Sequence, residues 1–451
     1  MTNLARLHEL GLFDARAPRY TSYPPANHFT NTVGGADVAA WQAALPAGAR
    51  VSLYLHVPFC RRLCWFCACR TQGTATDRPI IPYLSYLHEE LRLVAQSLPA
   101  DVVVSHIHLG GGTPTLLSPE MFAELGAALA AFRPVAEDLQ FSVEIDPTEV
   151  DAPRIAALRG IGMNRVSIGV QDFDPVVQEA IGRIQSYETT REVVEILRAH
   201  GIGSINMDLL YGLPHQNVAR IADSVDKLLS LSPDRVALYG YAHVPWVAKR
   251  QVLIPEEALP GAEERYDLFE TARTRFLRAG YREIGIDHFA REGDSMAAAD
   301  RDGTLRRDFQ GYTVDDSVAL VGLGASAISR YPQGYAQNNP SSSLYATAIE
   351  AGRLATLRGH AFSDDDRLRS RMIEDLMCRF TLDLPRIAAA HGVEVARLRV
   401  MVAPALAAFG DAVRLRDDRL EIVESPRLIA RMVAQELDAY GRPEGHHSRA
   451  L

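Results

Sequence analysis

The 451-residue sequence contains few cysteines and no long apolar run. Its longest apolar stretches, such as residues 318–328, are too short and too often interrupted by glycine to span a bilayer. Residues 1–13 contain Arg6, His8 and Glu9 and so lack the apolar centre of a secretory signal. Basic residues number 47 against 56 acidic ones, which argues against an extended nucleic-acid surface. These absences predict a soluble cytoplasmic protein without a membrane span or a nucleic-acid partner.

The few cysteines are concentrated in one place. Four of the five lie within ten residues, at Cys60, Cys64, Cys67 and Cys69. An alternating apolar run over residues 51–57 leads into the first of them, so we expect the thiols on a loop that leaves a strand. Thiolates this close repel one another unless a disulfide, a zinc ion or an iron–sulfur cluster compensates for their charge.

The spacing of these cysteines favours one of the three possibilities. Adjacent disulfides within ten residues would be strained, and a chain with one other cysteine is not a disulfide scaffold. Structural zinc sites usually combine two pairs of ligands well apart in the sequence, and no second CxxC or HxxxH pair is present. Three thiolates from Cys60, Cys64 and Cys67 suit an iron–sulfur cube with one iron left free. The cluster is therefore favoured, and a four-cysteine zinc site stays open.

Residues 51 to about 290 alternate between short β-rich runs and amphipathic helical patterns. Strands are predicted at residues 51–57, 106–109, 141–145, 165–169, 204–209, 235–241 and 282–286. Helices are predicted at residues 83–96, 119–131, 153–159, 189–200, 218–229 and 263–279. Such repetition indicates α/β crossovers and a mostly parallel sheet. Because no GxGxxG follows an early strand, a partial (β/α) barrel is predicted in place of a dinucleotide-binding sheet.

Polar or glycine-rich segments follow five consecutive predicted strands. The first is GGGTPT at residues 110–115, whose backbone N–H groups we expect to converge on an anion or carboxylate. The others contain Glu144, Gln171, Asp208 and Ala242 in turn. Each alone is most simply a tight turn or a helix cap. Together they indicate a ligand site on one rim of the barrel.

Three further segments complete the predicted organisation. Residues 1–50 contain PRYTSYPP at 18–25, whose prolines favour an extended arm across the barrel. Residues 287–345 are predicted as loops, in which Gln310 and the pair Gly322 and Gly324 are candidates to close over a ligand. For His288 a core histidine with satisfied hydrogen bonds is the commoner alternative. The barrel is thus assigned to residues 51–345 and a smaller domain to residues 360–440.

The smaller domain is predicted to be mainly helical and winged-helix-like. Helical patterns cover residues 364–380, 384–391, 393–408 and 426–440, and a hairpin over 413–423 turns at Asp417 and Asp418. Its acidic residues argue against a DNA-binding face, so we interpret it as a lid or packing domain. Cys378 is interpreted as a core residue, and the polar tail 441–451 is predicted to be disordered.

CxxxCxxC with Phe66 before the third cysteine resembles the signature of the radical S-adenosylmethionine (SAM) superfamily. The additional Cys69 and the PRYTSYP segment are similar to the oxygen-independent coproporphyrinogen III oxidases (coproporphyrinogen dehydrogenases) of that superfamily. By this resemblance Cys60, Cys64 and Cys67 hold a [4Fe–4S] cluster, whereas Cys69 is not a ligand. The resemblance also implies a partial barrel and an N-terminal arm that helps to close the active site.

The resemblance further implies two SAM molecules and assigns their contacts. The cluster-bound SAM is expected to contact Tyr54, Gly111, Glu144 and Ile328. The second SAM is expected to contact Phe66, Gly112, Thr113, Gln171, Arg183, Asp208 and Ala242. Candidate catalytic or substrate-contacting residues are Cys69, Arg19, Tyr20, His288 and Gln310. For Arg183 a solvated arginine at a helix end is the alternative.

The implied activity is the oxidative decarboxylation of two propionates of coproporphyrinogen III to vinyl groups, giving protoporphyrinogen IX in anaerobic haem biosynthesis. It requires an electron donor and an electron acceptor that the sequence does not identify, and the resemblance suggests a monomer. Three alternatives are a related haem chaperone, a haem-degrading radical SAM methyltransferase and a non-enzymatic zinc module. The chaperone typically lacks both the fourth cysteine and the PRYTSYP arm, which this sequence has.

Overall fold

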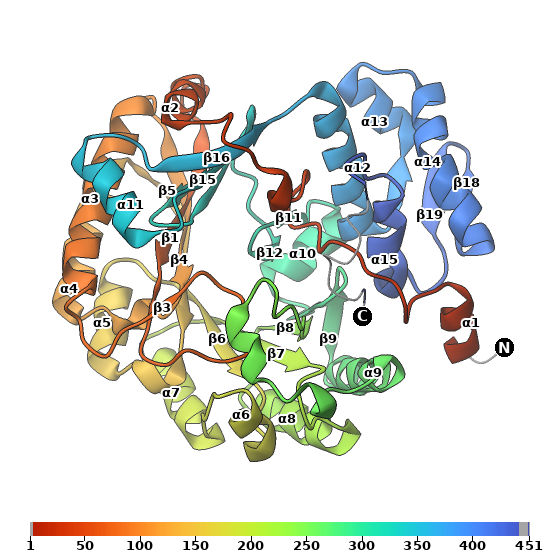
Figure 1. Ribbon diagram of the computed structural model, residues 1–451, viewed down its shortest axis with the longest axis horizontal. Coiled ribbons are helices and arrows are strands. Elements are labelled where there is room, and N and C mark those ends of the chain that lie inside the picture. Colours follow the sequence, from red (N-terminus) through yellow and green to blue (C-terminus); the bar gives the residue numbers. More distant parts are fainter. Residues whose placement is uncertain (1–2, 442–449, 451) are drawn as a thin grey trace.

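A twelve-stranded curved sheet forms the centre of the computed structural model, which describes residues 3–441 and 450 (Figure 1). The parallel strands, in sheet order, are β13 (Ala319–Leu323), β1 (Arg50–Val57), β4 (Val103–Gly111), β5 (Val135–Ile145), β6 (Arg165–Gln171), β7 (Ser204–Tyr211) and β8 (Arg235–Gly240). Antiparallel β14 (Ile328–Tyr331), β15 (Gly334–Asn338) and β16 (Thr356–Ala361) extend one edge, and β10 (His288–Arg291) and β9 (Tyr281–Ile284) the other. The predicted partial barrel is confirmed.

Helices cover the outer side of this sheet (Figure 1). They are α3 (Ile80–Ser97), α4 (Pro119–Phe132), α5 (Ala152–Gly160), α6 (Pro175–Ala180), α7 (Tyr187–Ala199), α8 (Val218–Ser230) and α9 (Ala262–Arg278). Ser118, Asp151, Ser186 and Asn217 each accept a hydrogen bond from the backbone amide three residues ahead, which fixes the start of four of these helices. All seven strands and all six helices predicted for residues 51 to about 290 are present within a few residues of their predicted bounds.

The prediction of loops over residues 287–345 is wrong. This region contains β10, α10 (Ser295–Asp302), β11 (Arg306–Asp308), β12 (Gly311–Thr313), β13, β14, β15 and α11 (Ser342–Glu350). Its strands have three to five residues each, which is too short for a period-two pattern to emerge. Pairing with distant strands orders them instead, since Gly322 of β13 lies opposite Tyr54 of β1.

The N-terminal arm is extended only in its middle. Helices α1 (Asn3–Glu9) and α2 (Gly35–Ala43) lie at its two ends, and the short 3₁₀ helix Ala26–His28 interrupts it. Between α1 and α2 the chain passes from the C-terminal helices across to the edge of the sheet (Figure 1). There the backbones of Thr30 and Gly359 exchange two hydrogen bonds of 2.8 Å, which hold the arm against β16.

The C-terminal helices surround a small three-stranded sheet. They are α12 (Asp364–Arg379), α13 (Leu384–His391), α14 (Val395–Phe409) and α15 (Pro426–Gln435), and the sheet contains β17 (Thr381–Asp383), β18 (Val413–Arg416) and β19 (Arg419–Ile422). Asp417 and Asp418 have φ angles of 51° and 59°, as a tight hairpin turn requires. The hairpin prediction is therefore confirmed. Strand β17 was not predicted, and α15 ends five residues before the predicted end at residue 440.

The arm and the C-terminal helices share one apolar core. Leu7, Leu12 and Tyr23 of the arm pack in the same cluster as Met372 and Ile429. Cys378 is 3% exposed within a neighbouring apolar cluster, which confirms its interpretation as a core residue.

Most of the tail predicted to be disordered, residues 442–449 and 451, lies outside the described residues. Ala450 is described, and its backbone N–H donates to the carbonyl of Ala15 over 2.8 Å. Within the described residues no helix is long and apolar enough to cross a membrane.

Candidate active site

A cavity of about 660 Å³ occupies the inside of the curved sheet. Its walls include polar side chains at alternate positions of successive strands, namely Ser52, Tyr54, His56, His106, His108, Gln140, Ser142, Glu144, Arg165, Ser167, Asn206 and Asp208. Alternate residues of a strand point to the same face, so these side chains share the inner face of the barrel. A barrel interior with only a structural role is filled by apolar side chains, whereas this one has the composition of a ligand site.

The cysteine loop closes one end of this cavity. It begins at β2 (Phe59–Cys60), which pairs with β3 (Gln72–Gly73), so the ends of the loop are held together. All five cysteines, each within the described part of the chain, are free thiols. The structure therefore has no disulfide in the cysteine loop.

A single metal ion does not fit the loop. Among the residues that the structure describes, no three His, Cys, Asp or Glu side chains come close enough together to hold one ion. A [4Fe–4S] cube places each thiolate on a different iron, so its ligands need not share one coordination sphere. The donor set of three thiols on one loop fits that larger group and does not fit the four-cysteine zinc site.

The surroundings of the loop favour a thiolate at Cys67, whereas burial raises the pKa of Cys60 to about 11. Hydrogen bonding with Cys69 outweighs burial and lowers the pKa of Cys67, and the charges of Arg250 and Arg183 act in the same direction. Arg183 is 8% exposed, and its Nη1 lies 3.5 Å from Cys64 Sγ and 3.1 Å from Asp146 Oδ2. The alternative of a solvated arginine is thus wrong, because Arg183 is a buried part of the cysteine loop's surroundings.

The backbone amides of the glycine-rich turn contact one carboxylate and two carbonyls of the protein. Gly111 N–H donates to Glu144 Oε2 over 3.0 Å, while the amides of Gly112 and Thr113 donate to the carbonyls of Val57 and Phe59. Of the N–H groups expected to converge on an anion or carboxylate, that of Gly111 thus contacts a carboxylate, whereas the other two contact backbone carbonyls. A Cβ on Gly112 would lie 2.5 Å from the Phe59 carbonyl oxygen, so glycine is required for close packing of the turn against the cysteine loop.

Glu144 is held in its ionised form beside this turn. His108 Nε2 lies 3.1 Å from Glu144 Oε1 and the Gly111 amide contacts the other oxygen. Burial alone would raise the pKa of Glu144, but the hydrogen bond and charge of His108 hold it below its usual value. Tyr54 stacks on His108 and bonds with His56, so these side chains form one polar group inside the barrel.

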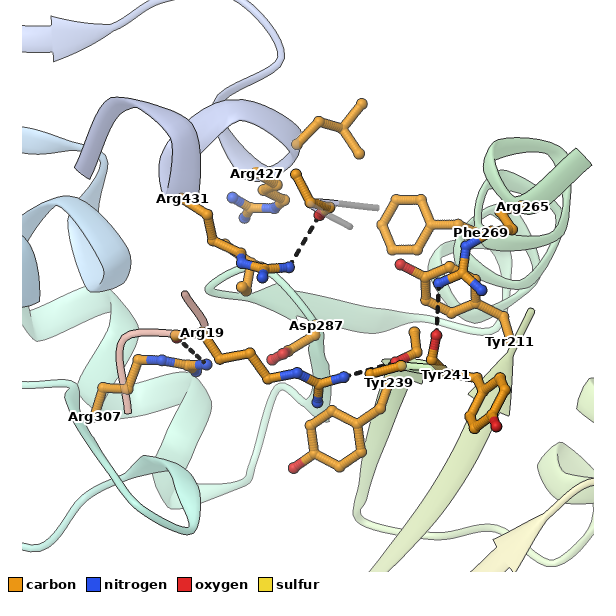
Figure 2. Close-up of a pocket in the computed structure, with 15 residues that line it drawn as sticks. Arg19, Tyr211, Tyr239, Tyr241, Arg265, Phe269, Asp287, Arg307, Arg427 and Arg431 are labelled. Carbon is orange, nitrogen blue, oxygen red and sulfur yellow. Dashed lines mark hydrogen bonds between the residues drawn. The ribbon is translucent and has the colours of Figure 1, made fainter. Parts of the chain in front are cut away.

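Residues predicted for the second SAM lie in different surroundings. Asp208 lines the large cavity, and burial raises its pKa to about 6. Gln171 ends β6 with a left-handed φ of 69°. The Phe66 carbonyl accepts a hydrogen bond of 2.7 Å from Gln251, whose Nε2 also reaches Ala242 O. Ala242 lines a separate small pocket near β8 (Figure 2).

The structure brings four of the five candidate catalytic or substrate residues to the large cavity. They are Cys69, Arg19, His288 and Gln310. Tyr20 is not among the described residues that line it, because its hydroxyl turns to Asp438 Oδ2 at 3.2 Å. Gly111, Ile328 and Tyr54 line the same cavity, so cluster-side and substrate-side candidates face one space.

Sequence reasoning missed several residues of the site. His56 and His108 lie within the strands, two residues or more before the strand-end segments that were predicted to form the site. The alternation of polar residues along these predicted strands could have identified them. Tyr239, Asp308 and Arg307 belong to the site through tertiary packing, and nothing local in the sequence marks them.

Comparison with known proteins defines the class and then the family. Residues 54–228 match the model of the Radical SAM superfamily, so the three-cysteine loop and partial barrel are those of a radical SAM protein. An oxygen-independent coproporphyrinogen III oxidase of Paracoccus denitrificans is 56% identical over 100% of both chains, and one of Cereibacter sphaeroides is 54% identical over 99% of this chain and 100% of the relative. Coproporphyrinogen III oxidase of Escherichia coli has a solved structure with a TM-score of 0.89 and 34% identity, covering 94% of this chain and 98% of that one. The chain belongs to the oxygen-independent coproporphyrinogen III oxidase family.

Proposed function

We propose that this chain decarboxylates two propionate side chains of coproporphyrinogen III to vinyl groups, giving protoporphyrinogen IX. The observation that carries the proposal is a single large cavity. It is lined at the cysteine-loop end by Cys69, Gly111 and Glu144, and it is also lined by His288 and Gln310. The high identity to the named oxidases over the whole chain supports the same activity, and it does not favour the haem chaperone or the methyltransferase.

Cys60, Cys64 and Cys67 would hold the [4Fe–4S] cluster, and Cys69 would stay a free thiol in the cavity. When bound, the reduced cluster and SAM supply the one-electron chemistry that removes a hydrogen atom from the β-carbon of a propionate. The C–C bond to the carboxylate then breaks, CO₂ leaves, the vinyl double bond forms and one electron passes to an acceptor. The task of the protein is to orient the propionate and to keep water away from the reacting carbon.

Tyr54, Gly111, Glu144 and Ile328 are proposed contacts of the cluster-bound SAM. The ionised Glu144 carboxylate beside the Gly111 amide is suited to an ammonium or a ribose hydroxyl. A second SAM is proposed to contact Phe66, Gly112, Thr113, Gln171, Arg183, Asp208 and Ala242. The buried Arg183 supports this set, because its Nε is buried without a hydrogen-bond partner among the described residues.

His288 is proposed as a positioning residue on the substrate side. Its Nδ1 lies 2.6 Å from Asp287 Oδ1 and its Nε2 lies 3.4 Å from the Tyr239 hydroxyl. The Asp287 carboxylate thereby fixes the ring, and Nε2 faces the cavity to hydrogen-bond a carboxylate or a pyrrole N–H. Gln310 and Arg19 would add polar contacts to the same substrate, and Tyr20 would act through the arm.

The surrounding parts are proposed to cover this site. Residues 1–50 and 360–440 would act together as a lid over the barrel of residues 51–345, since Tyr20 and Tyr23 of the arm pack in the core of the C-terminal helices. We further propose a cytoplasmic monomer that receives and releases electrons through separate redox partners.

The test is an anaerobic assay of cluster-loaded protein with a reductant, SAM and coproporphyrinogen III. Methionine and the divinyl product should appear together, and omission of SAM should abolish both. Haem methylation or haem binding without formation of vinyl product would support the alternative functions.

A further inference from the structure

Arginine side chains surround a small pocket where the arm, β8 and α15 meet (Figure 2). They are Arg19 from the arm, Arg265 from α9, Arg307 from β11, and Arg427 and Arg431 from α15. Asp287 is the single acidic residue among the described residues that line the pocket. The pocket is therefore positively charged, although the chain as a whole has a net charge of −9. Its volume of about 50 Å³ suits a group no larger than a carboxylate.

Three of these arginines are fixed by the protein itself and build the walls. Arg427 Nε lies 2.9 Å from Glu283 Oε2, which balances its charge. Arg265 donates to the carbonyl of Tyr241 over 3.0 Å, and Arg431 donates to the carbonyl of Ala450 over 3.1 Å (Figure 2). Arg431 also donates to the carbonyl of Pro18 over 3.0 Å.

Arg19 and Arg307 are bound differently. Arg307 stacks on the Tyr312 ring at 4.5 Å and donates through Nη2 to the Arg19 carbonyl over 3.1 Å. Its Nε and Nη1 are buried without a hydrogen-bond partner among the described residues. Arg19 donates through Nη2 to the Gly240 carbonyl over 2.8 Å. Within the part of the chain that the structure describes, these contacts leave both guanidinium groups without a carboxylate in ion-pair distance.

Arg19 is exposed, whereas Arg307 has buried donors without a partner among the described residues. Such buried donors on a guanidinium are costly unless an anion binds them. Asp287 does not supply that anion in full, because its carboxylate is already bound to His288 Nδ1 at 2.6 Å. A carboxylate can accept two parallel N–H bonds from one arginine, which satisfies donors that a water or a carbonyl would leave unused.

The pocket borders the large cavity. Arg19 and Tyr239 line both spaces, and Figure 2 shows them side by side next to Asp287. Cys69, Gly111 and Glu144 line the large cavity but are not among the described residues around the pocket. A group that enters the pocket from the cavity is thus held away from the cysteine-loop end.

We propose that Arg19 and Arg307 bind one of the two propionate carboxylates that the reaction leaves intact. This assignment rests on the proposed function. Coproporphyrinogen III has four propionates, of which two are converted, so a carboxylate is available for this contact in both rounds. The pair fixes one corner of the macrocycle, and the reacting propionate then points toward Glu144 and the cysteine loop. SAM also has a carboxylate, and Ala242, a proposed contact of the second SAM, lines the pocket. The test therefore measures the effect on the porphyrin and on SAM separately.

The experiment compares Arg307→Met and Arg307→Lys with wild type, using the full-length, cluster-loaded protein. Arg291→Met is the matched control, since Arg291 also stacks on a tyrosine, at 5.4 Å, and donates to a backbone carbonyl. Arg291 is not among the described residues that line either space. For Arg307→Met we expect the KM for coproporphyrinogen III to rise about tenfold or more, with a smaller fall in kcat and an unchanged KM for SAM. For Arg307→Lys we expect a KM between those of wild type and Arg307→Met. Lysine keeps the positive charge but lacks the two parallel N–H donors of a guanidinium.

A binding measurement separates recognition from turnover. Fluorescence titration with coproporphyrin III, the stable oxidised macrocycle, should show about tenfold weaker binding to Arg307→Met than to Arg291→Met. The tetramethyl ester of coproporphyrin III, which has no free carboxylate, should bind both variants equally. Arg19→Met should weaken coproporphyrin III binding in the same way, and it serves as the second variant if Arg307→Met loses iron or fails to fold.

Two outcomes would overturn the assignment. Equal coproporphyrin binding by wild type, Arg307→Met and Arg19→Met would exclude a carboxylate contact in the pocket. A rise in the KM for SAM with unchanged porphyrin binding would assign the pocket to the carboxylate of SAM. Failure of the proposed function is distinguishable from both, because wild type would then form no vinyl product.

Discussion

The two ends of the active-site region are built in contrasting ways. At the cysteine-loop end the groups come from two contiguous stretches of the chain. Residues 60–69 follow shortly after β1, and residues 110–113 lie at the end of β4. At the arginine end, Arg19, Asp287 and Arg307 come from distant parts of the chain and meet only in the fold. The first end thus depends on local motifs, whereas the second depends on the packing of the arm and the C-terminal helices against the barrel. We propose that the chemistry takes place at the first end and that the substrate is recognised at the second.

The largest effect is expected for a substitution that disrupts the cysteine-loop end alone. Cys64→Ser should abolish iron and sulfide binding and therefore all vinyl product, because serine does not replace a thiolate ligand of the cluster. Coproporphyrin III should still bind, since the arginine end is untouched. Iron and sulfide analysis with fluorescence titration checks both points, and Cys378→Ala is the control for loss of a cysteine elsewhere. Retention of the full iron content by Cys64→Ser would contradict the ligand assignment.

Cys69→Ser tests whether the fourth cysteine of the loop has a different role from the three proposed cluster ligands. It should keep the iron and sulfide content of wild type, because Cys69 is not a proposed ligand. Turnover should fall about 10²-fold, since Cys69 lines the cavity and its side chain hydrogen-bonds with Cys67. Iron analysis and product formation are measured on the same preparation. Loss of iron as complete as in Cys64→Ser would make Cys69 a ligand.

Arg183→Met tests whether the cysteine-loop end holds a second SAM. Removal of the buried guanidinium should lower the binding of SAM by about one molecule per chain, with the iron content retained. Equilibrium dialysis with labelled SAM measures the stoichiometry. Arg191→Met, on the exposed face of α7, is the matched control. Removal of Arg183 leaves Asp146 without its ion pair, which could unfold the protein. Arg183→Lys keeps a positive charge beside Asp146 and controls for this loss of folding. If wild type itself binds a single SAM, the two-SAM proposal is wrong.

The smallest effect is expected outside both ends, at Glu90 on α3. Its carboxylate accepts hydrogen bonds from Tyr345, Asn338 and the Gly324 amide, and burial raises its pKa to about 7. Because the folded-state pKa lies above the ordinary value of 4.5, stability should fall as the pH rises from about 4.5 through 7. Glu90→Gln cannot ionise and should remove a difference of about 1 kcal/mol between pH 6 and pH 8. Thermal unfolding at both pH values measures this; an unchanged pH dependence would contradict the raised pKa.

The same contrast explains what the sequence could predict. Seven strands and six helices of the barrel follow from β-rich runs that alternate regularly with helical patterns, and the cysteine loop is contiguous in the sequence. His56 and His108 were also within reach, because polar residues alternate along 52–56 and 106–108. Strands β13, β14 and β15 were not, since pairing with distant strands orders runs of only four or five residues.

The arginine end lay beyond sequence reasoning for a physical reason. Arg307 follows a short helix and precedes a turn, and its local context is that of any surface arginine. Its role follows from burial against Tyr312 and from the Arg19 carbonyl, 288 residues away in the sequence. Only the fold brings these groups together.

The most direct measurement follows deuterium from coproporphyrinogen III labelled at the β-carbons of its propionates. The reaction is run anaerobically with SAM, reductant and cluster-loaded protein, and the 5′-deoxyadenosine formed from SAM is analysed by mass spectrometry. We expect deuterium in the 5′-deoxyadenosine of wild type, in step with vinyl product, and none with Cys64→Ser. Vinyl product formed by wild type without deuterium transfer would contradict the account.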